Sequence, residues 1–226
     1  MAMTRREWIG KVAAAGALPM AGGAWAQAGT LKISHQFPGG TITEGDFRDR
    51  LCRRFAADIE KRSNGALKAA VYPGASLMKT NAQFSAMRKG ALDISLYPLS
   101  YAGGEVAETN IGLMPALVPS YEVGAQWKTS EVGKLLTKIL DEKGIVVLSW
   151  SWQAGAEQEK FATDAARADD KIAADVYARA GAKVYDLDEP TVRKWQAFAR
   201  NTAWKDYAER GETSAALLKA AQKLLA

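Results

Sequence analysis

Residues 31–38 read LKISHQFP, residues 67–74 read LKAAVYPG and residues 92–98 read LDISLYP. Each stretch begins with a short run rich in apolar and β-branched or aromatic residues, and each run stops at a proline. Such runs, bounded by turn residues, are typical of strands. The pattern predicts three strands, at Leu31–Ser34, Leu67–Tyr72 and Leu92–Tyr97.

Amphipathic segments separate these runs. The first has an apolar side chain every fourth residue in a charged background, at Phe47, Leu51, Phe55 and Ile59. This spacing predicts a surface helix, which Asn64-Gly65 ends. Residues 81–89 predict a second helix, with Phe84 and Met87 facing inward and Gly90 after its end. The order β-α-β-α-β predicts an α/β fold with a parallel sheet and right-handed crossovers.

The sequence after Tyr101 shows no regular pattern and has prolines at 115 and 119. The apolar residues of positions 121–143 then predict a helix. The run IVVL at residues 145–148 is continuously apolar, which predicts a central strand buried on both faces. Its outgoing end carries Trp150 and Trp152. Because side chains alternate along a strand, only one of the two can face a ligand, and we favour Trp152.

The character of the sequence changes at Gly155-Ala156. Residues 157–180 are rich in alanine and charge and predict a helix, and Lys183–Tyr185 predicts a short strand. Asp188-Glu189-Pro190 predicts the start of another helix, because proline in a first turn loses no hydrogen bond. Residues 214–225 predict a last helix. We expect the aromatic residues of this part to pack in the core, namely Trp195, Phe198 and Trp204.

Residues 1–26 have the features of an export signal. Arg5-Arg6 precede a short Ala/Gly/Leu run that ends in Ala24-Trp25-Ala26, a small-x-small cleavage pattern. Residues 4–9 (TRREWI) resemble a twin-arginine signal, and an ordinary secretory signal is the alternative. The apolar run is too short for a membrane span. We expect a soluble exported protein that begins near Gln27.

Composition excludes several classes of protein. The single cysteine, Cys52, excludes an internal disulfide framework and any Cys-cluster zinc site, and we expect it to be a small core residue. The single histidine, His35, excludes metal sites that need two imidazoles. Lys and Arg exceed Asp and Glu by only five, without a dense basic block, so nucleic-acid binding is not indicated. No phosphate-binding Gly-rich motif is present, and we expect no metal and no cofactor.

Ligands of open parallel sheets lie beyond the carboxyl ends of the strands. The side chains expected there are mostly aromatic or neutral polar groups, which suit recognition better than catalysis. A nucleophile would need an activating base, and His35 is the only imidazole available. The predicted ligand-binding residues are His35, Gln36, Phe37, Tyr72, Lys79, Tyr97, Ser100, Tyr101 and Trp152. For His35 a strand-end structural role is the alternative, and for Lys79 a solvated one. Arg53 and Arg54 are expected to be exposed helix charges.

Several stretches, taken in order, resemble one family: the DctP-like periplasmic substrate-binding subunits of TRAP transporters. They are LKISHQFP (31–38), FAADIEKRSNG (55–65), VYPGASL (71–77), GALDI (90–94) with Tyr97, and WKDYA (204–208). The resemblance implies a periplasmic-binding-protein-like lobe with flanking helices. It also implies a non-enzymatic periplasmic protein that captures small organic acids, such as dicarboxylates, and delivers them to the transporter's membrane subunits.

The chain departs from this family after Gly155. Family members have two α/β lobes, and the second lobe carries an arginine, in a stretch resembling Gly-Leu-Lys-Ile-Arg, that pairs with the ligand carboxylate. Nothing after Gly155 resembles that stretch, and the chain is short by roughly 100 residues, about one small domain. We therefore expect residues 1–26 to be the signal, 27–155 the ligand-binding lobe, and 156–226 C-terminal helices with one short strand.

Without the arginine and the second lobe, binding is expected to be millimolar or absent, because exposed hydrogen bonds are worth only about 0.5–1.5 kcal/mol each. Three interpretations stay open: a solute-binding protein with impaired binding, an enzyme on the same lobe, and a non-binding relic or protein–protein module that could form a dimer through uncovered apolar surface. The lack of a base, nucleophile or metal set argues against the enzyme.

Overall fold

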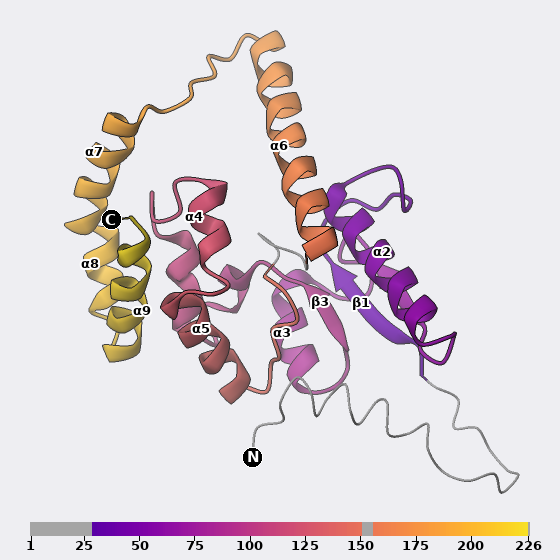
Figure 1. The fold of residues 1–226 in the computed structure, drawn as a ribbon. Coiled ribbons are helices and arrows are strands. Elements are labelled where there is room, and N and C mark those ends of the chain that lie inside the picture. Colours follow the sequence, from indigo (N-terminus) through magenta and orange to yellow (C-terminus); the bar gives the residue numbers. More distant parts are fainter. Residues whose placement is uncertain (1–28, 151–155, 226) are drawn as a thin grey trace, which may run out of the picture.

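The computed structural model describes residues 29–150 and 156–225, and a small parallel sheet lies at the centre of its N-terminal part (Figure 1). The strands are β1 (Leu31–His35), β2 (Ala69–Tyr72) and β3 (Ile94–Leu96), in the order β2-β1-β3. Ile33 of the central strand pairs with Val71 on one side and with Ile94 on the other. The three predicted strands, their parallel pairing and the α/β class are confirmed.

Helices α2 (Phe47–Arg62) and α3 (Thr80–Arg88) connect the strands, as predicted. Asp46 caps α2, because its side chain accepts a hydrogen bond from Arg48 N. Helix α2 ends where Gly65 adopts a φ of 80°, a conformation that glycine reaches without strain. Helix α2 packs beside β2, and α3 packs beside β3.

The prediction of one continuous helix over residues 121–143 is wrong. After two 3-10 helices, η1 (Leu99–Ala102) and η2 (Ala107–Leu113), the chain forms two helices, α4 (Tyr121–Gln126) and α5 (Glu131–Glu142). Ser130 begins the second one, since its hydroxyl accepts a hydrogen bond from Gly133 N. Gly133 also permits close packing, because a Cβ there would lie 1.9 Å from the Trp127 carbonyl oxygen. The apolar periodicity did not reveal this break.

The predicted buried strand at residues 145–148 does not form. Ile145 and Val147 pack against the hydrophobic core, whereas Val146 and Leu148 are 38% and 43% exposed. A strand buried on both faces needs a layer over each face. In the part of the chain that the structure describes, only one face of this segment is covered.

The C-terminal part is helical. Helix α6 (Ala156–Arg179) runs away from the sheet, and a connection then crosses to three further helices, which pack beside α4 and α5 (Figure 1). These are α7 (Glu189–Arg200), α8 (Ala203–Ala208) and α9 (Glu212–Gln222), followed by η3 (Lys223–Leu225). The predicted strand Lys183–Tyr185 is wrong, because the whole connection is extended and exposed and has no neighbouring strand among the described residues.

The main hydrophobic core joins the two parts of the chain. Trp204 and Tyr207 of α8 are fully buried in it, as are Leu136 and Leu140 of α5. The Trp204 indole donates a hydrogen bond to the Pro115 carbonyl oxygen at 3.0 Å, and the Tyr207 hydroxyl donates to that of Glu108 at 2.8 Å. Buried Trp and Tyr side chains need such partners for their polar atoms. The helices therefore close the core of the N-terminal part.

The expectation that Trp195 and Phe198 pack in the core is wrong, since both are more than half exposed and lie edge to face against each other. The expectation for Trp204 is confirmed, and Cys52 is buried, as predicted for a core residue. The predicted export signal lies outside the described residues. Among the helices that the structure describes, none is both long and apolar enough to cross a membrane.

Candidate functional site

The carboxyl ends of β1 and β2 are held together by backbone hydrogen bonds. Ala75 N donates to the His35 carbonyl oxygen, and Gly74 N donates to that of Phe37, both at 2.8 Å. Gly74 has a φ of 61°, which turns the chain back toward β1. The turn after β2 therefore lies against the segment after β1, as the parallel topology requires.

Asp49 is a fully buried carboxylate that organises the segment after β1. Its Oδ1 lies 3.0 Å from His35 Nε2, and its Oδ2 accepts from Gly40 N at 2.8 Å and from Arg53 Nε at 2.7 Å. A buried charge is tolerated only when it is paired and hydrogen-bonded. Asp49 thus links the end of β1, the following loop and helix α2.

His35 is also fully buried, and its Nδ1 has no hydrogen-bond partner among the described residues. Burial lowers the pKa of His35 below its usual value, although the neighbouring Asp49 opposes this shift. The neutral ring therefore keeps its proton on Nε2 and donates it to Asp49. In this structure His35 has a strand-end structural contact rather than an open face toward solvent.

Aromatic side chains gather after β3. The Tyr97 ring lies 6.3 Å from that of Phe84 and 6.2 Å from that of Tyr101, between ring centres. The Tyr97 hydroxyl oxygen is buried and has no partner within the described ranges. Burial, with the nearby Glu105 carboxylate, raises the pKa of Tyr97 to about 12, so the phenol stays protonated. This hydroxyl can donate a hydrogen bond to a ligand oxygen if side chains move to admit it.

The predicted ligand-binding residues differ widely in accessibility. Gln36, Phe37, Tyr72, Tyr97 and Ser100 are half-buried, and Lys79 and Tyr101 are exposed. The prediction for Trp152 falls outside the described residues, whereas its neighbour Trp150 is buried in the core.

Phe37 has a defined environment among these residues. The Arg48 guanidinium carbon lies 3.7 Å from the centre of its ring, and the ring stacks on His35 with 6.0 Å between centres. Such a guanidinium–aromatic contact is favourable by about 0.5–1 kcal/mol where it is partly exposed.

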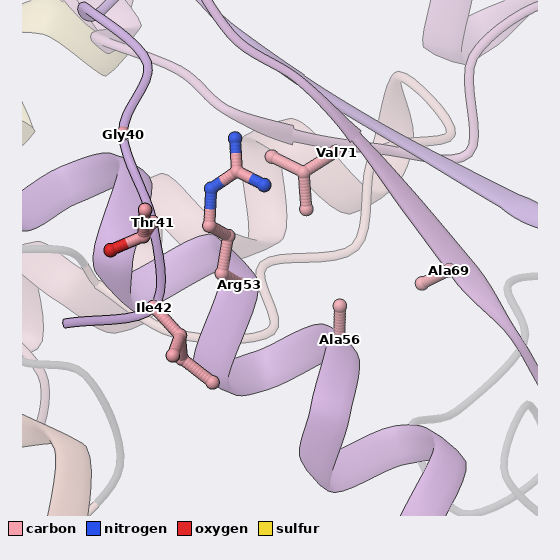
Figure 2. Close-up of a pocket in the computed structure, with 7 residues that line it drawn as sticks. All are labelled: Gly40, Thr41, Ile42, Arg53, Ala56, Ala69 and Val71. Atoms are coloured by element: carbon pink, nitrogen blue, oxygen red, sulfur yellow. The ribbon is translucent and has the colours of Figure 1, made fainter. Parts of the chain in front are cut away.

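A pocket of about 430 Å³ lies between α2, the edge strand β2 and the loop after β1 (Figure 2). Its seven lining residues are Gly40, Thr41, Ile42, Arg53, Ala56, Ala69 and Val71. Arg53 is the single charged residue among these seven. The expectation that Arg53 is merely an exposed charge is wrong, because its Nε is bonded to the buried Asp49 and its side chain is 31% exposed.

Sequence reasoning missed Asp49 and misjudged Arg53. The available signal was an acidic residue four positions before an arginine on the first predicted helix, which places both on one side of that helix. That side could not be recognised as inward, because the surrounding residues are also strongly charged. The same helix carries Arg48, Arg50 and Arg54, which look equivalent in the sequence.

The arrangement offers no catalytic set within the described residues. No group of three or more His, Cys, Asp or Glu side chains there could hold a metal ion. Burial raises the pKa of the Cys52 thiol to about 12, so it is not a nucleophile at neutral pH. His35 and Asp49 bond to each other in the interior and activate no neighbouring hydroxyl. Binding by neutral donors and aromatic walls is the chemistry that these residues support.

A three-stranded parallel sheet whose strands are connected by helices is an α/β arrangement, and ligands of such sheets lie beyond the carboxyl ends of the strands. The family model for DctP, bacterial extracellular solute-binding protein family 7, matches residues 41–164, more than half of the chain. The chain belongs to this family. The family consists of bacterial extracellular solute-binding proteins.

Three similar proteins give this family membership more detail. A solute-binding protein of Albidiferax ferrireducens is 42% identical over 316 residues, covering 89% of this chain and 94% of that protein. A TRAP periplasmic solute binding protein from Rhodoferax ferrireducens, crystallised with bound malonate, is 41% identical with a TM-score of 0.79, covering 86% of this chain and 98% of its own. The C4-dicarboxylate-binding periplasmic protein DctP of Rhodobacter capsulatus is 28% identical over 156 residues, covering 68% of this chain and 45% of that protein.

The Albidiferax alignment also measures what this chain lacks. It extends over 316 positions, whereas the chain has 226 residues, so at least 90 positions of the alignment have no residue here. This difference agrees with the absence of most of a second lobe.

Proposed function

We propose that this protein is an extracytoplasmic solute-binding protein of a TRAP-type transporter, which captures small carboxylates for the membrane subunits of that transporter. The observation that carries the proposal is the 41% identity to a family member crystallised with malonate, together with a TM-score of 0.79 between the two structures. A carboxylate offers four lone-pair directions, which suit the hydroxyls and amides after the strands.

The proposed ligand surface consists of the exposed and half-buried groups after the three strands. Tyr97, Ser100 and Tyr101 supply hydroxyls, Gln36 supplies an amide, and Lys79 supplies the nearby positive charge. The further proposed contacts are Phe37 and Tyr72 as apolar walls, and Trp152. The buried His35 supports this surface from beneath through its hydrogen bond to Asp49. Because such a surface is open to water, we expect dissociation constants in the millimolar range.

Calorimetry with malonate tests this function. We expect weak saturable binding that falls at least fivefold in Tyr101→Leu. A matched control is Tyr177→Leu, which removes another exposed tyrosine, on α6. Equal affinity in both variants, or no binding of malonate, succinate or pyruvate at 50 mM, would refute carboxylate capture by this surface.

We also propose that residues 1–26 direct export to the periplasm through the twin-arginine route. The paired Arg5-Arg6 and the Ala24-Trp25-Ala26 pattern support this. Exported protein should begin at Gln27 or within two residues of it. Replacement of both arginines by lysine should leave the precursor in the cytoplasm, and continued export of that variant would favour an ordinary secretory signal.

A second candidate function is self-association through exposed apolar side chains near the C-terminal end of α6. Phe161, near its beginning, lies beneath the guanidinium groups of Arg50 and Arg54, 5.1 and 4.1 Å from the ring centre. Phe161 begins an apolar stripe along one side of α6. This stripe continues to Ile172 and Val176, which are 59% and 56% exposed. Helix α2 therefore covers the start of the stripe and leaves its end uncovered.

The charges around this end suit a second copy of the chain. In an antiparallel pair of α6 helices centred on residue 174, Ile172 of each copy faces Val176 of the other, and Asp169 faces Arg179. Two such stripes bury far less than the roughly 800 Å² per partner of a stable complex, so association should need high concentrations.

Sedimentation velocity from 10 µM to 1 mM tests this association. The chain should shift toward a dimer near the top of this range, and Ile172→Asp should stay monomeric. Ala173→Asp adds the same charge about 100° around the helix and should still associate. A chain that is monomeric throughout, or a dimer that survives Ile172→Asp, would exclude this interface.

A further inference from the structure

We infer that the pocket of Figure 2 is a separate binding site for a short-chain aliphatic monocarboxylate, with Arg53 as its anion-binding group. The proposal goes beyond the proposed function, because it concerns a different surface and a different ligand. It rests on three observations: the free donors of one guanidinium, the four apolar side chains near it, and the side of the sheet on which the pocket lies.

The donors of Arg53 are only partly used. Its Nε donates to Asp49 at 2.7 Å, and the two terminal nitrogens have no hydrogen-bond partner among the described residues. In Figure 2 the guanidinium points into the space beside Val71 and Gly40. A guanidinium presents parallel N–H groups that match the two oxygens of a carboxylate. The bond to Asp49 fixes the plane of the group, so little side-chain entropy is lost when an anion binds.

The electrostatics of the pocket follow from the position of Asp49. This carboxylate is fully buried and is bonded to His35, Gly40 N and Arg53, so it lies behind the guanidinium and does not line the pocket. The pairing of Asp49 with Arg53 weakens the positive potential, and solvent at the exposed loop weakens it further. A dissociation constant between about 0.1 and 10 mM, or 3 to 5 kcal/mol, is the range that such a site supports.

The other side chains that line the pocket determine what the ligand can carry beyond its carboxylate. Ile42, Ala56, Ala69 and Val71 present only carbon atoms from their side chains. A chain of two to four carbons can lie against them and bury apolar surface. The Thr41 hydroxyl also lines the pocket, but it accepts from Thr43 N and Glu44 N and points away from the Arg53 guanidinium in Figure 2. A second carboxylate at the end of such a ligand would meet the four apolar side chains and would find no second guanidinium. The site therefore selects monocarboxylates over dicarboxylates.

The pocket is distinct from the surface after the strands. Ala69 and Val71 line it, and side chains alternate along a strand, so Ala70 and Tyr72 of β2 face the other side of the sheet. Tyr72 belongs to the proposed malonate surface, whereas Val71 belongs to the pocket. Ligands at the two places therefore perturb different residues.

An NMR titration of the chain at constant ionic strength tests the pocket. Butyrate should shift the backbone amide signals of Gly40, Ile42, Ala69 and Val71 in a saturable way, and succinate should do so at least tenfold more weakly. Butanol, which has the same chain length without the charge, should also bind at least tenfold more weakly. Equal shifts with butanol, or butyrate shifts confined to Tyr97 and Tyr101, would overturn the assignment.

Two substitutions on α2 provide the matched comparison. Ala56→Leu fills the pocket without removing Arg53 and should weaken butyrate binding at least tenfold. Ala57→Leu adds the same volume on the exposed side of the helix and should leave the affinity within twofold. Butyrate affinity that is the same in both variants would refute the site.

Arg53→Gln should also abolish binding, and a thermal melt would show whether that variant is folded. Malonate titrated into Ala56→Leu reports on the proposed function alone, because its signals come from Tyr97 and Tyr101. Failure of one proposal is thus distinguishable from failure of the other.

Discussion

Residues 31–96 and residues 145–187 contain the same kind of sequence signal with opposite outcomes. In the first region three short apolar runs form the paired strands β1, β2 and β3, and Ile33 in the middle is 1% exposed. In the second region two runs with strand-like composition, at 145–148 and 183–185, form no strand. Both regions have β-branched residues and flanking turn signals, so local propensity does not separate them.

The difference lies in what surrounds each run. Strands β2 and β3 both pair with β1, and helices α2 and α3 pack beside them. The second region lies on either side of α6, and at least 90 positions of the alignment with the Albidiferax relative have no residue in this chain. A strand is stabilised by neighbours and not by its own backbone, because its hydrogen bonds are made to other strands. A segment can therefore keep a strand's sequence after its partners are gone.

The largest expected effect comes from restoring the missing partners. Insertion of the unmatched segment of the Albidiferax relative after Gly155 should raise malonate affinity about 1,000-fold, or about 4 kcal/mol, because a second lobe excludes water from the charged contacts. Calorimetry measures the affinity, and hydrogen exchange measures protection of residues 145–148. Unchanged exchange there would mean that these residues are not strand-forming even with a second lobe.

The next effect concerns the buried carboxylate of the first region. Asp49→Asn should lower the free energy of unfolding by about 3 kcal/mol, since it removes the charge that His35, Gly40 N and Arg53 share in the interior. Urea denaturation measures the change, with Glu60→Gln on the exposed face of α2 as the control. A loss below 1 kcal/mol would show that this network is not central to the fold.

A paired truncation compares the two regions directly. Ile33→Ala should cost about 2–5 kcal/mol, because it leaves a cavity in the central strand. Val146→Ala should cost less than about 0.5 kcal/mol, because Val146 is already exposed to solvent. Both values come from the same urea titrations. Similar losses at the two positions would contradict the contrast between a paired strand and an uncovered one.

The smallest effect is a dependence of stability on pH. Burial lowers the pKa of His35 in the folded chain, so the unfolded chain takes up this proton first. Stability should therefore be constant above the unfolded pKa near 6.5 and fall as the pH drops below it, by at most about 1.4 kcal/mol per pH unit, until the folded pKa is passed. The chain has one histidine, so His35→Gln should remove the slope between pH 7 and 5.5. A slope that persists in His35→Gln would assign it to another group.

Much of the molecule could be predicted because its elements are specified locally. The apolar residue at every fourth position marks α2, and Pro190 with Asp188 marks the start of α7, where the Asp188 side chain accepts a hydrogen bond from Thr191 N. The family could also be identified, because its motifs occur in order along residues 31–97. The break between α4 and α5 was missed, because a serine cap interrupts the backbone without interrupting the apolar pattern.

The sequence alone determined the class of the fold, the alternation of three strands and two helices over residues 31–96, and the residues at these strand ends, because hydrophobic periodicity and turn residues act over a few neighbouring positions. Only the tertiary structure decided that Arg53 faces a pocket with a buried Asp49 behind it, whereas Arg54 lies against Phe161. Only the tertiary structure decided that residues 145–148 are no strand. Burial, charge pairing and strand formation depend on partners distant in the chain, and an amino-acid pattern does not show whether those partners are present.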